Sequence, residues 1–310
     1  SYYKTLHIYG VPKFTSFTIP NAGTAANGTQ LTATFKGKNF AAPDVDVSLF
    51  KATCDSKKTI TADSSIKVIN DTTATVLLTI PDTEGTYNVK LTYGEESTNA
   101  DFVVRDTSSY TVGDVMLSDG TKVDYQENQT FTDDQKTKAV AVIGGFRNGV
   151  PLGVGIVHKQ MAWCTSSAAG YNKNITALQG DKTTGYMDGS DGWEILKEAC
   201  SDAESNPEKY PAWNYSLTYA ETNGLTGDLA TGWYLPTVAE LYTIYQNKDV
   251  VDGSLSKVGG STFGTSWYWS CCQNPSGNNN ARVLYFYNGG MYYDYKYGYY
   301  NYVCSVRAFN

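Results

Sequence analysis

Short runs of alternating apolar and polar residues fill the first hundred positions, and this pattern constrains the fold more than any other feature. Leu31, Ala33 and Phe35 alternate with polar residues, and later runs such as 87–93 repeat the alternation. A period of two places successive side chains on opposite faces of a strand, and several such runs about ten residues apart are typical of an antiparallel sandwich. The pattern therefore predicts an all-β domain over residues 1–106.

Turn residues separate these runs. Pro81 and Asp82 end one run, and residues 94–99 are expected to form the turn before the run at Phe102. Cys54 falls among the predicted strands, where an isolated cysteine is typically a buried thiol. No catalytic pattern occurs in this part of the chain.

The composition changes after the short polar segment 106–110 (DTSSY), and we place a second domain over residues 107–310. Runs at 139–144 and 153–159 have the length of strands, and Asp119-Gly120 predicts a tight turn between two further strands. The second domain is therefore expected to contain both strands and helices.

Two segments carry the signals of a helix start. Thr237 followed by Glu240 matches a capping box, and Ile244 lies on the apolar face that continues from it. A helix is also predicted to begin with an acidic cap at Asp191, followed by a glutamate three residues later. The first of these helices is expected to fade near Asn247.

The charge of the chain limits its partners. The net charge is -7 and the pI is near 4.9, so no basic patch is expected to neutralise the phosphates of a nucleic acid. The apolar runs are far shorter than a membrane span. Because the sequence begins without a methionine or a signal peptide, we expect membrane attachment only through a removed N-terminal anchor. These features favour a cell-surface protein, lipid-anchored to an outer membrane or secreted.

Residues that hold metals and cofactors are sparse. The six cysteines form no Cys-x-x-Cys pair, and only His7 and His158 could complement them, so no metal or other cofactor is expected. His158 is expected to have a backbone partner rather than to act as a base. Segment 188–194 (DGSDGWE) lacks the distal glutamate of an EF-hand, and the glycines of 144–155 lack the spacing of a phosphate loop.

Tyrosine is concentrated near the C-terminus. Nine of the 25 tyrosines lie in residues 282–302 (RVLYFYNGGMYYDYKYGYYNY). Since a buried tyrosine needs a partner for its hydroxyl, this density favours a surface that is partly wet in the free protein and is covered on binding. Tyrosine, serine, glycine and asparagine are also common in antibody binding sites. The run predicts a recognition surface, with an ordinary aromatic edge or a dimer interface as the structural alternative.

Motifs of the second domain resemble one known family. In chain order they are 233–237 (WYLPT) with Glu240 and Leu241, Gly259-Gly260, 268–270 (YWS), and Val303 with Val306-Arg307. From about Val112 to Phe309 they resemble the formylglycine-generating-enzyme-like branch of the C-type lectin fold. The tyrosine-rich C-terminus is similar to variable proteins that retroelements diversify, those of treponemes in particular. This resemblance implies an α+β domain in which two helices flank small antiparallel sheets and the last strands form an exposed ligand-binding face.

The first domain resembles another group of proteins. Residues 37–40, 73–76 and 85–104 resemble bacterial surface immunoglobulin-like domains of the IPT/TIG type. Such domains mostly act as spacers that hold another module away from a membrane. The resemblance implies an immunoglobulin-like stalk.

The enzymes of the second family imply an alternative function. They oxidise a cysteine of a sulfatase with copper that is bound by two cysteines a few residues apart. This sequence departs from that pattern, because Cys271 and Cys272 are adjacent and Cys304 lies far downstream. We therefore expect no enzyme activity, with a copper-dependent cysteine oxidase as one alternative. Another is a structural adhesin whose tyrosines make a homomeric contact, although a monomer is expected.

The codon chemistry of retroelement diversification divides the tyrosine-rich region. An AAC codon changed at its adenines becomes an NNC codon, which encodes Tyr, Asp, Gly, Cys or Val but never Trp, Met, Gln or Lys. Residues of the second kind belong to a fixed scaffold: Trp267, Trp269, Gln273, Met291 and Lys296. The predicted ligand-binding positions are Cys272, Val283, Tyr285, Tyr287, Tyr292, Tyr293, Asp294, Tyr295, Tyr297, Gly298, Tyr299 and Tyr300. The expected ligand is an unknown protein or another host or cell-surface molecule.

Strand alternation predicts how the variable positions are displayed. If Leu284 and Phe286 point into the core, then Val283, Tyr285 and Tyr287 share the opposite face. Fixed and variable residues are therefore expected to lie on different faces of the sheet.

The cysteines carry two further expectations. Adjacent Cys271 and Cys272 are expected to point to opposite faces of one strand, so that at most one joins the tyrosine surface. The resemblance to C-type lectins implies a disulfide between Cys200 and Cys304.

Overall fold

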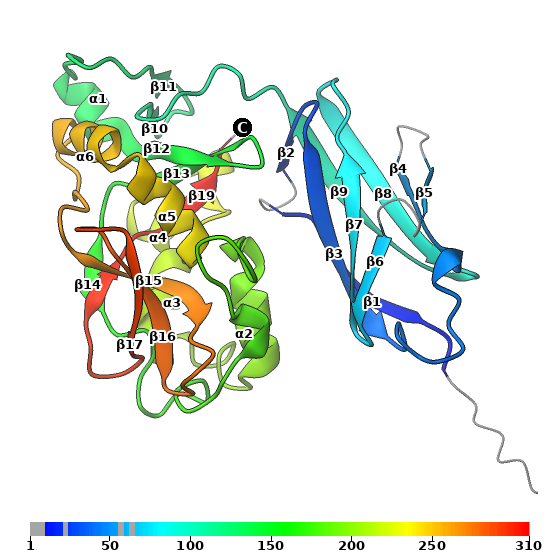
Figure 1. Cartoon of the computed structure of the whole chain (residues 1–310). Coiled ribbons are helices and arrows are strands. Elements are labelled where there is room, and N and C mark those ends of the chain that lie inside the picture. The colour runs from blue at the N-terminus through cyan, green and yellow to red at the C-terminus, as the bar shows by residue number, and fades with distance from the viewer. Residues whose placement is uncertain (1–9, 21–23, 55–58, 62–65, 310) are drawn as a thin grey trace, which may run out of the picture. The chain divides into compact units, whose positions relative to one another are not determined.

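The computed structural model describes residues 10–20, 24–54, 59–61 and 66–309 (Figure 1). The chain divides into two compact units, Ser1–Thr107 and Ser108–Phe309, one residue from the boundary placed on the sequence. His7 lies outside the described residues. None of the described helices combines the length and the apolar run that a bilayer span requires.

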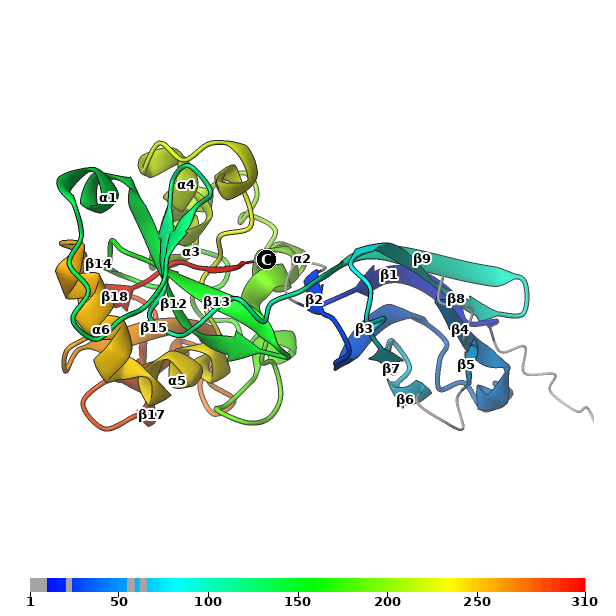
Figure 2. The same cartoon turned by 90° about the horizontal axis from the view of Figure 1, so that it is seen from above.

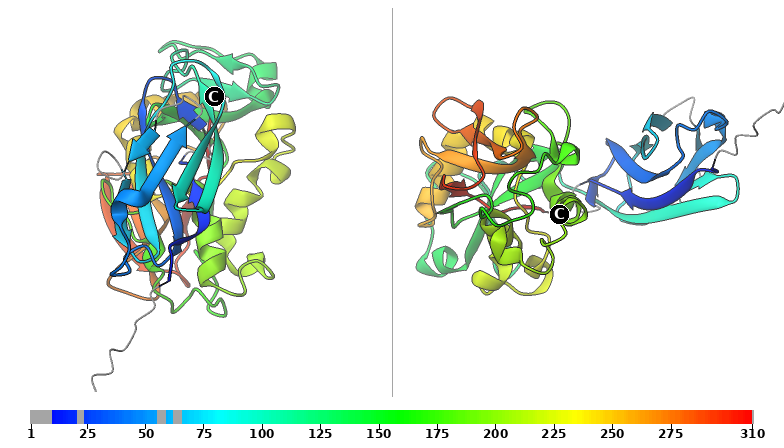
Figure 3. Two further views of the ribbon diagram at one scale, coloured as in Figure 1. Left: turned by 90° about the vertical axis from the view of Figure 1, so that its right-hand side faces the viewer. Right: turned by 90° about the horizontal axis from the view of Figure 1, so that it is seen from below.

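Strands make up most of the described N-terminal unit, together with one short 3-10 helix (Val47–Leu49). The strands are β1 (Lys13–Thr18), β2 (Thr24–Ala26), β3 (Gln30–Lys38), β4 (Phe50–Cys54), β5 (Thr59–Thr61), β6 (Ile66–Asn70), β7 (Thr73–Thr79), β8 (Gly85–Tyr93) and β9 (Glu96–Arg105). Two sheets form, in the orders β1-β3-β7-β6 and β2-β9-β8-β4-β5, and only β2 beside β9 is a parallel pair among these described strands. Figure 3 shows these sheets from a second direction. The predicted immunoglobulin-like sandwich is confirmed.

The core of this unit follows the alternation in the sequence. Leu31, Ala33 and Phe35 are buried along β3. The rings of Phe35, Phe40 and Phe50 pack 5.5 to 6.1 Å apart and join the two sheets. Burial of large aromatic rings accounts for much of the stability of such a core.

Two smaller expectations for the N-terminal unit have different outcomes. Cys54 is buried, as predicted. The predicted turn over 94–99 is too long, because Tyr93 pairs with Glu96 and only two residues connect β8 to β9. Gly94 has a φ of 59°, which a tight hairpin turn requires and glycine adopts at low cost.

The C-terminal unit contains two five-stranded sheets. Its strands are β10 (Val115–Leu117), β11 (Lys122–Val123), β12 (Ala139–Arg147), β13 (Val150–Gly155), β14 (Lys159–Met161), β15 (Trp267–Gln273), β16 (Asn280–Tyr285), β17 (Gly290–Tyr295), β18 (Asn301–Val303) and β19 (Val306–Ala308). The sheets have the orders β11-β10-β12-β13-β19 and β14-β18-β15-β16-β17. The predicted strand pair around Asp119-Gly120 is β10 and β11.

Helices cover these sheets, so the unit contains both helices and strands. They are α1 (Asp133–Lys138), α2 (Gly192–Ala199), α3 (Pro211–Leu217), α4 (Tyr219–Thr222), α5 (Val238–Gln246) and α6 (Lys248–Lys257). Helix α5 contacts β12 of one sheet and β15 and β16 of the other, and α6 contacts β12 (Figures 1 and 2). The core between the sheets therefore includes one face of α5.

The two predicted helix starts differ in outcome. Thr237 and Glu240 form the predicted capping box, and α5 ends before Asn247, as expected. Helix α2 begins directly after Asp191, as predicted, but the Asp191 carboxylate does not cap it and instead accepts a 2.5 Å hydrogen bond from the Tyr186 hydroxyl.

More helices form than the two that the resemblance implies. Helix α6 begins directly after α5 and contains a glycine, yet Val251 and Leu255 are fully buried. Burial of these side chains stabilises a helix whose own composition is a weak helix signal.

Candidate functional site

Most of the tyrosine-rich run lies in β16 and β17, at one edge of the sheet β14-β18-β15-β16-β17, and in the loops that follow these strands. Strand β16 pairs with β15 on one side and with β17 on the other, all antiparallel, and β17 is the outermost strand. Trp267, Tyr285 and Gly290 lie opposite one another, as do Trp269, Val283 and Tyr292. The register therefore fixes which side chains share a face.

The residues assigned to the scaffold are buried or half-buried. Trp269 is fully buried and donates a 2.9 Å hydrogen bond from Nε1 to the carbonyl of Met161. Gln273 is also buried, and its amide nitrogen donates to three backbone carbonyls. Trp267 and Met291 are half-buried. These side chains hold β15 and its neighbours in place.

Lys296 anchors the chain where it leaves β17. Its ammonium is buried and donates 2.9 Å hydrogen bonds to the carbonyls of Gly170, Lys173 and Asn278. Nζ also lies 4.8 Å from the ring of Trp163. Burial lowers the pKa of Lys296 to about 8. A lysine at this position thus ties the displayed segment to three other parts of the unit.

Seven of the predicted ligand-binding residues are exposed tyrosines, with exposed fractions from 44% to 67%. They are Tyr287, Tyr292, Tyr293, Tyr295, Tyr297, Tyr299 and Tyr300. Among the described residues of 108–309, the other large apolar side chain that is exposed is Phe146. With roughly half of each ring exposed, the seven tyrosines together present on the order of 700 Å² of aromatic surface, which is divided between the two faces of β17 and the loops beside it.

Exposure does not follow the two faces of the sheet as predicted. Tyr292 lies on the face of Val283, whereas Tyr293 lies opposite Arg282 and so shares the face of Leu284 and Met291 across the pleat. Both tyrosines are exposed on the edge strand β17, whereas α5 packs mainly against β15 and β16. Exposure of these tyrosines therefore follows from their position on the edge strand and not from the face of the sheet to which they point.

The prediction that Val283 is displayed is wrong. Val283 shares a face with Tyr285, as expected, but it is fully buried. It lies between Trp269 of β15 and Tyr292 of β17, whose aromatic side chains flank it on the same face. The neighbouring Tyr285 is half-buried, with its ring stacked 4.1 Å from that of Trp267.

The prediction that Cys272 is displayed is also wrong, since Cys271 and Cys272 are both fully buried. A bulge in β15 between Trp269 and Gln273 breaks the alternation that would send them to opposite faces. The Cys272 sulfur instead accepts a 3.4 Å hydrogen bond from the backbone NH of Val238, at the start of α5.

The two remaining predicted positions are polar or small. Asp294 is half-buried and accepts a 2.8 Å hydrogen bond from the Asn301 side chain, which links β17 to β18. Gly298 is exposed, with a φ of 88°, in the turn between Tyr297 and Tyr299. The turn thus presents the last tyrosines on a short connection.

The implied disulfide is absent, because Cys200 and Cys304 are both free and buried. Cys200 lies within electrostatic range of Cys164, whereas Cys304 lies near Tyr215 and Tyr268. Burial raises the pKa of Cys304 above its usual value and that of Cys164 to about 12. Both thiols are held protonated in the interior.

His158 has the backbone partner that was predicted. Its Nε2 lies 3.1 Å from the carbonyl oxygen of Gly155, and its Nδ1 lies 2.7 Å from the hydroxyl of Tyr268. Complete burial lowers the pKa of His158 to about 3. The ring is neutral and is a part of the core.

Glu240 is fully buried, and it has hydrogen-bond partners outside the capping box that the sequence did not predict. It accepts hydrogen bonds from the Tyr234 hydroxyl at 2.7 Å and from the backbone NH groups of Thr237 and Gly189 at 2.8 and 3.2 Å. Burial, reinforced by the nearby charge of Asp188, raises the pKa of Glu240 to about 7. This residue connects the start of α5 to the segment before α2.

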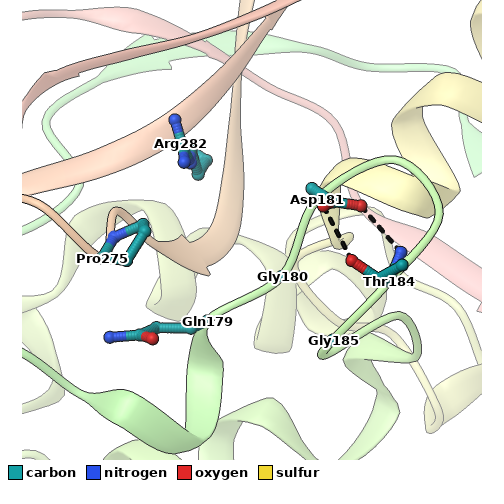
Figure 4. A pocket seen from close by; sticks show the side chains of 7 residues that line it. All are labelled: Gln179, Gly180, Asp181, Thr184, Gly185, Pro275 and Arg282. Atoms are coloured by element: carbon teal, nitrogen blue, oxygen red, sulfur yellow. Dashed lines mark hydrogen bonds between the residues drawn. The ribbon is translucent and has the colours of Figure 1, made fainter.

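A small pocket of about 180 Å³ lies beside β16, between the loop 179–185, Pro275 and Arg282 (Figure 4). The sequence analysis did not identify it. Its one sequence signal is the segment 181–185 (DKTTG), in which Asp181 accepts hydrogen bonds from Thr183 and Thr184 and forms a tight turn. Arg282 comes from β16 and is separated by about a hundred residues from that loop, so only the fold brings them together.

Comparison with known proteins gives no family for the chain. No family model matches it, and no curated protein matches it. Among solved structures, it is similar to the Lin-41 filamin domain, with 12% identity, 29% of this chain and 90% of that chain covered, and a TM-score of 0.23.

Two further likenesses are to bacterial proteins. Domains 4 and 5 of the S-layer protein SbsC match at 18% identity over 30% of this chain and 46% of that one, with a TM-score of 0.20. The Yersinia pseudotuberculosis adhesin InvE matches at 12% identity over 95% of this chain and 70% of that one, with a TM-score of 0.20. With TM-scores this low, the fold and the site rest on this chain's own geometry.

Proposed function

We propose that this protein is a surface-displayed binding protein whose C-terminal unit presents a variable, tyrosine-rich ligand site. In this proposal the unit has the C-type lectin fold and belongs with retroelement-diversified variable proteins, as the motifs from Trp233 to Arg307 and the tyrosine-rich C-terminus suggest. The N-terminal sandwich serves as a stalk. The ligand is a protein or another cell-surface molecule, and the site carries no catalytic step.

One observation carries the proposal. The seven exposed tyrosines follow β16 along β17 and the turn after it, directly beside side chains that are buried and hydrogen-bonded. Such an arrangement allows the displayed residues to change while the core stays constant. These exposed rings offer a ligand a large aromatic area to bury on binding.

Sequencing the same gene from many cells tests the proposal without knowledge of the ligand. We expect substitutions confined to the ten predicted positions that are exposed or half-buried, since Cys272 and Val283 are buried. Trp269, Gln273 and Lys296 are expected to be constant. Substitutions scattered evenly over the C-terminal unit would contradict the proposal.

A double variant tests the binding role directly. Replacing Tyr295 and Tyr297 with serine is expected to leave the fold intact and to abolish capture of purified surface proteins by the immobilised chain. Sedimentation velocity of the native chain over a hundredfold range of concentration separates this function from a homomeric adhesin. A constant monomer supports the proposal, and self-association that the double variant loses would favour the adhesin.

A further inference from the structure

The pocket beside β16 contains a cationic group that the protein leaves without a partner. The Nε atom of Arg282 is buried and has no hydrogen-bond partner in the described part of the chain. No carboxylate within that part pairs with the guanidinium either. Buried donors are almost always satisfied in native proteins, so an unsatisfied arginine that lines a pocket indicates a ligand group that pairs with its guanidinium.

The carboxylate of Asp181, which also lines the pocket, already accepts hydrogen bonds within its own loop. Asp181 accepts hydrogen bonds from the backbone NH groups of Thr183 and Thr184, both at 2.7 Å, and from the Thr184 hydroxyl at 2.8 Å. These bonds lower the pKa of Asp181 to about 2. Figure 4 shows Asp181 bonded to Thr184 within its own turn, with Arg282 on a different segment. Asp181 is therefore ionised at neutral pH, and its hydrogen bonds stabilise the loop rather than the arginine.

The loop that forms the wall is held in one conformation. Gly180 and Gly185 form a bridge, and a Cβ added to Gly185, which has a φ of 77°, would lie 2.6 Å from the carbonyl oxygen of Gln179. Gln179 in turn bridges Gln273 of β15. These bridges hold the wall of the pocket in place, which reduces the entropic cost of binding.

The pocket adjoins the tyrosine surface. Arg282 lies directly opposite Tyr293 in the β16–β17 pair, and Tyr293 is exposed. Lys182, next to Asp181 in the loop, donates a 3.3 Å hydrogen bond to the carbonyl of Gly289, just before β17. A molecule that covers Tyr293 can therefore reach Arg282.

We propose that Arg282 binds a carboxylate of the ligand that covers the tyrosine surface, an inference that rests on the proposed function. A guanidinium matches a carboxylate through two parallel charge-assisted hydrogen bonds. The ionised Asp181 in the same pocket disfavours a doubly charged phosphate, because like charges at short range repel. The carboxylate is an acidic side chain of a protein ligand or a free small carboxylic acid.

The test uses acetate, succinate and an acidic peptide (Gly-Glu-Tyr-Gly) as probes of the full chain. We expect each to shift the Arg282 Nε–Hε signal in ¹H–¹⁵N NMR spectra, assigned from its loss in Arg282→Lys. Stronger binding of the peptide than of acetate identifies a side chain of a protein ligand as the source, and equal binding identifies a free acid. Arg282→Gln is expected to weaken binding about tenfold or more.

Lys136→Gln, which makes the same change of charge on the exposed part of α1, is the matched control and is expected to bind acetate like the native chain. No shift with any carboxylate, a shift that chloride reproduces, or tighter binding of inorganic phosphate would overturn the proposal. Because these probes need no tyrosine surface, failure here leaves the sequencing test of the proposed function untouched. Conversely, if the gene proved invariant among cells but Arg282 still bound carboxylates, only the proposal of a variable surface would be rejected.

Discussion

The tyrosines of the C-terminal unit form two groups that differ in where their hydroxyls bond. Tyr210, Tyr234 and Tyr268 are buried, and their hydroxyls bond to Asp202, Glu240 and His158 at 2.6 to 2.7 Å. The seven exposed tyrosines have no hydroxyl partner within the described residues, so their hydroxyls face water. A buried phenol with a fixed partner specifies the fold, whereas an exposed phenol without one is available to a ligand.

The largest expected effect on stability comes from removing the ring of a buried tyrosine. Tyr268→Ala deletes a fully buried ring that packs 4.6 Å from Phe263 and 5.0 Å from Phe286. We expect the free energy of unfolding of the C-terminal unit to fall by about 3–5 kcal/mol. All six tryptophans lie in this unit, so tryptophan fluorescence during urea unfolding reports on it alone.

The control for this change is Tyr268→Phe, which removes only the hydroxyl that faces His158. Its expected cost is about 1 kcal/mol. If the alanine variant were no less stable than the phenylalanine variant, Tyr268 would not belong to the structural group.

The second expected effect is a pH dependence that arises in the buried group. Burial raises the pKa of Glu240 to about 7, so between its ordinary value of 4.5 and 7 the folded protein binds more protons than the unfolded chain. The stability that this group contributes is fully present below pH 4.5 and is lost as the pH rises toward 7, by on the order of 3 kcal/mol. Unfolding free energies measured by fluorescence at several pH values check this.

Glu240→Gln is the control, because glutamine also fits the third position of a capping box but does not titrate. The difference between the native chain and this variant isolates Glu240 from the other ionisable groups. We expect the variant to lack the decrease in stability between pH 4.5 and 7. The same slope in both proteins would show that Glu240 is not the titrating group.

The N-terminal sandwich and the start of α5 could be predicted from local patterns in the sequence. Alternation identified the sandwich, because one face of each strand in it is buried against the facing sheet, as Leu31 and Phe35 show. The Thr237 and Glu240 pair identified α5, because capping depends on residues close in sequence. The same alternation did not predict the display of Val283, because the residues that cover it come from neighbouring strands.

The site was predictable only in part, for the same reason. Tyrosine density located the exposed surface, but burial of Cys272 depends on a bulge in β15 and on the backbone of α5. The pocket at Arg282 joins a loop and a strand that are far apart in sequence. Features that depend on contacts between distant segments require the fold before they can be identified.

A smaller effect on stability is expected at Tyr292, an exposed tyrosine that lies beside the buried Val283. Tyr292 lies opposite Val283, and its ring packs edge-on against Trp267 at 5.0 Å. We expect Tyr292→Ser to lower the free energy of unfolding by about 1 kcal/mol, the usual size of an aromatic or cross-strand contact. Urea unfolding followed by fluorescence measures it. A loss as large as that of Tyr268→Ala would place Tyr292 in the structural group.

The smallest effect is expected at Tyr300, in the turn before β18. Its side chain is 63% exposed, and no ring or hydrogen-bond partner binds it within the described residues. Tyr300→Ser is therefore expected to change the free energy of unfolding by less than about 0.5 kcal/mol, as for surface substitutions that touch no special feature. Because the same ring is part of the proposed ligand surface, its loss should lower ligand capture without lowering the urea midpoint. If the variant lost stability and ligand capture together, the side chain of Tyr300 would contribute to the fold. Tyr300 would then belong with the structural tyrosines rather than with the exposed group.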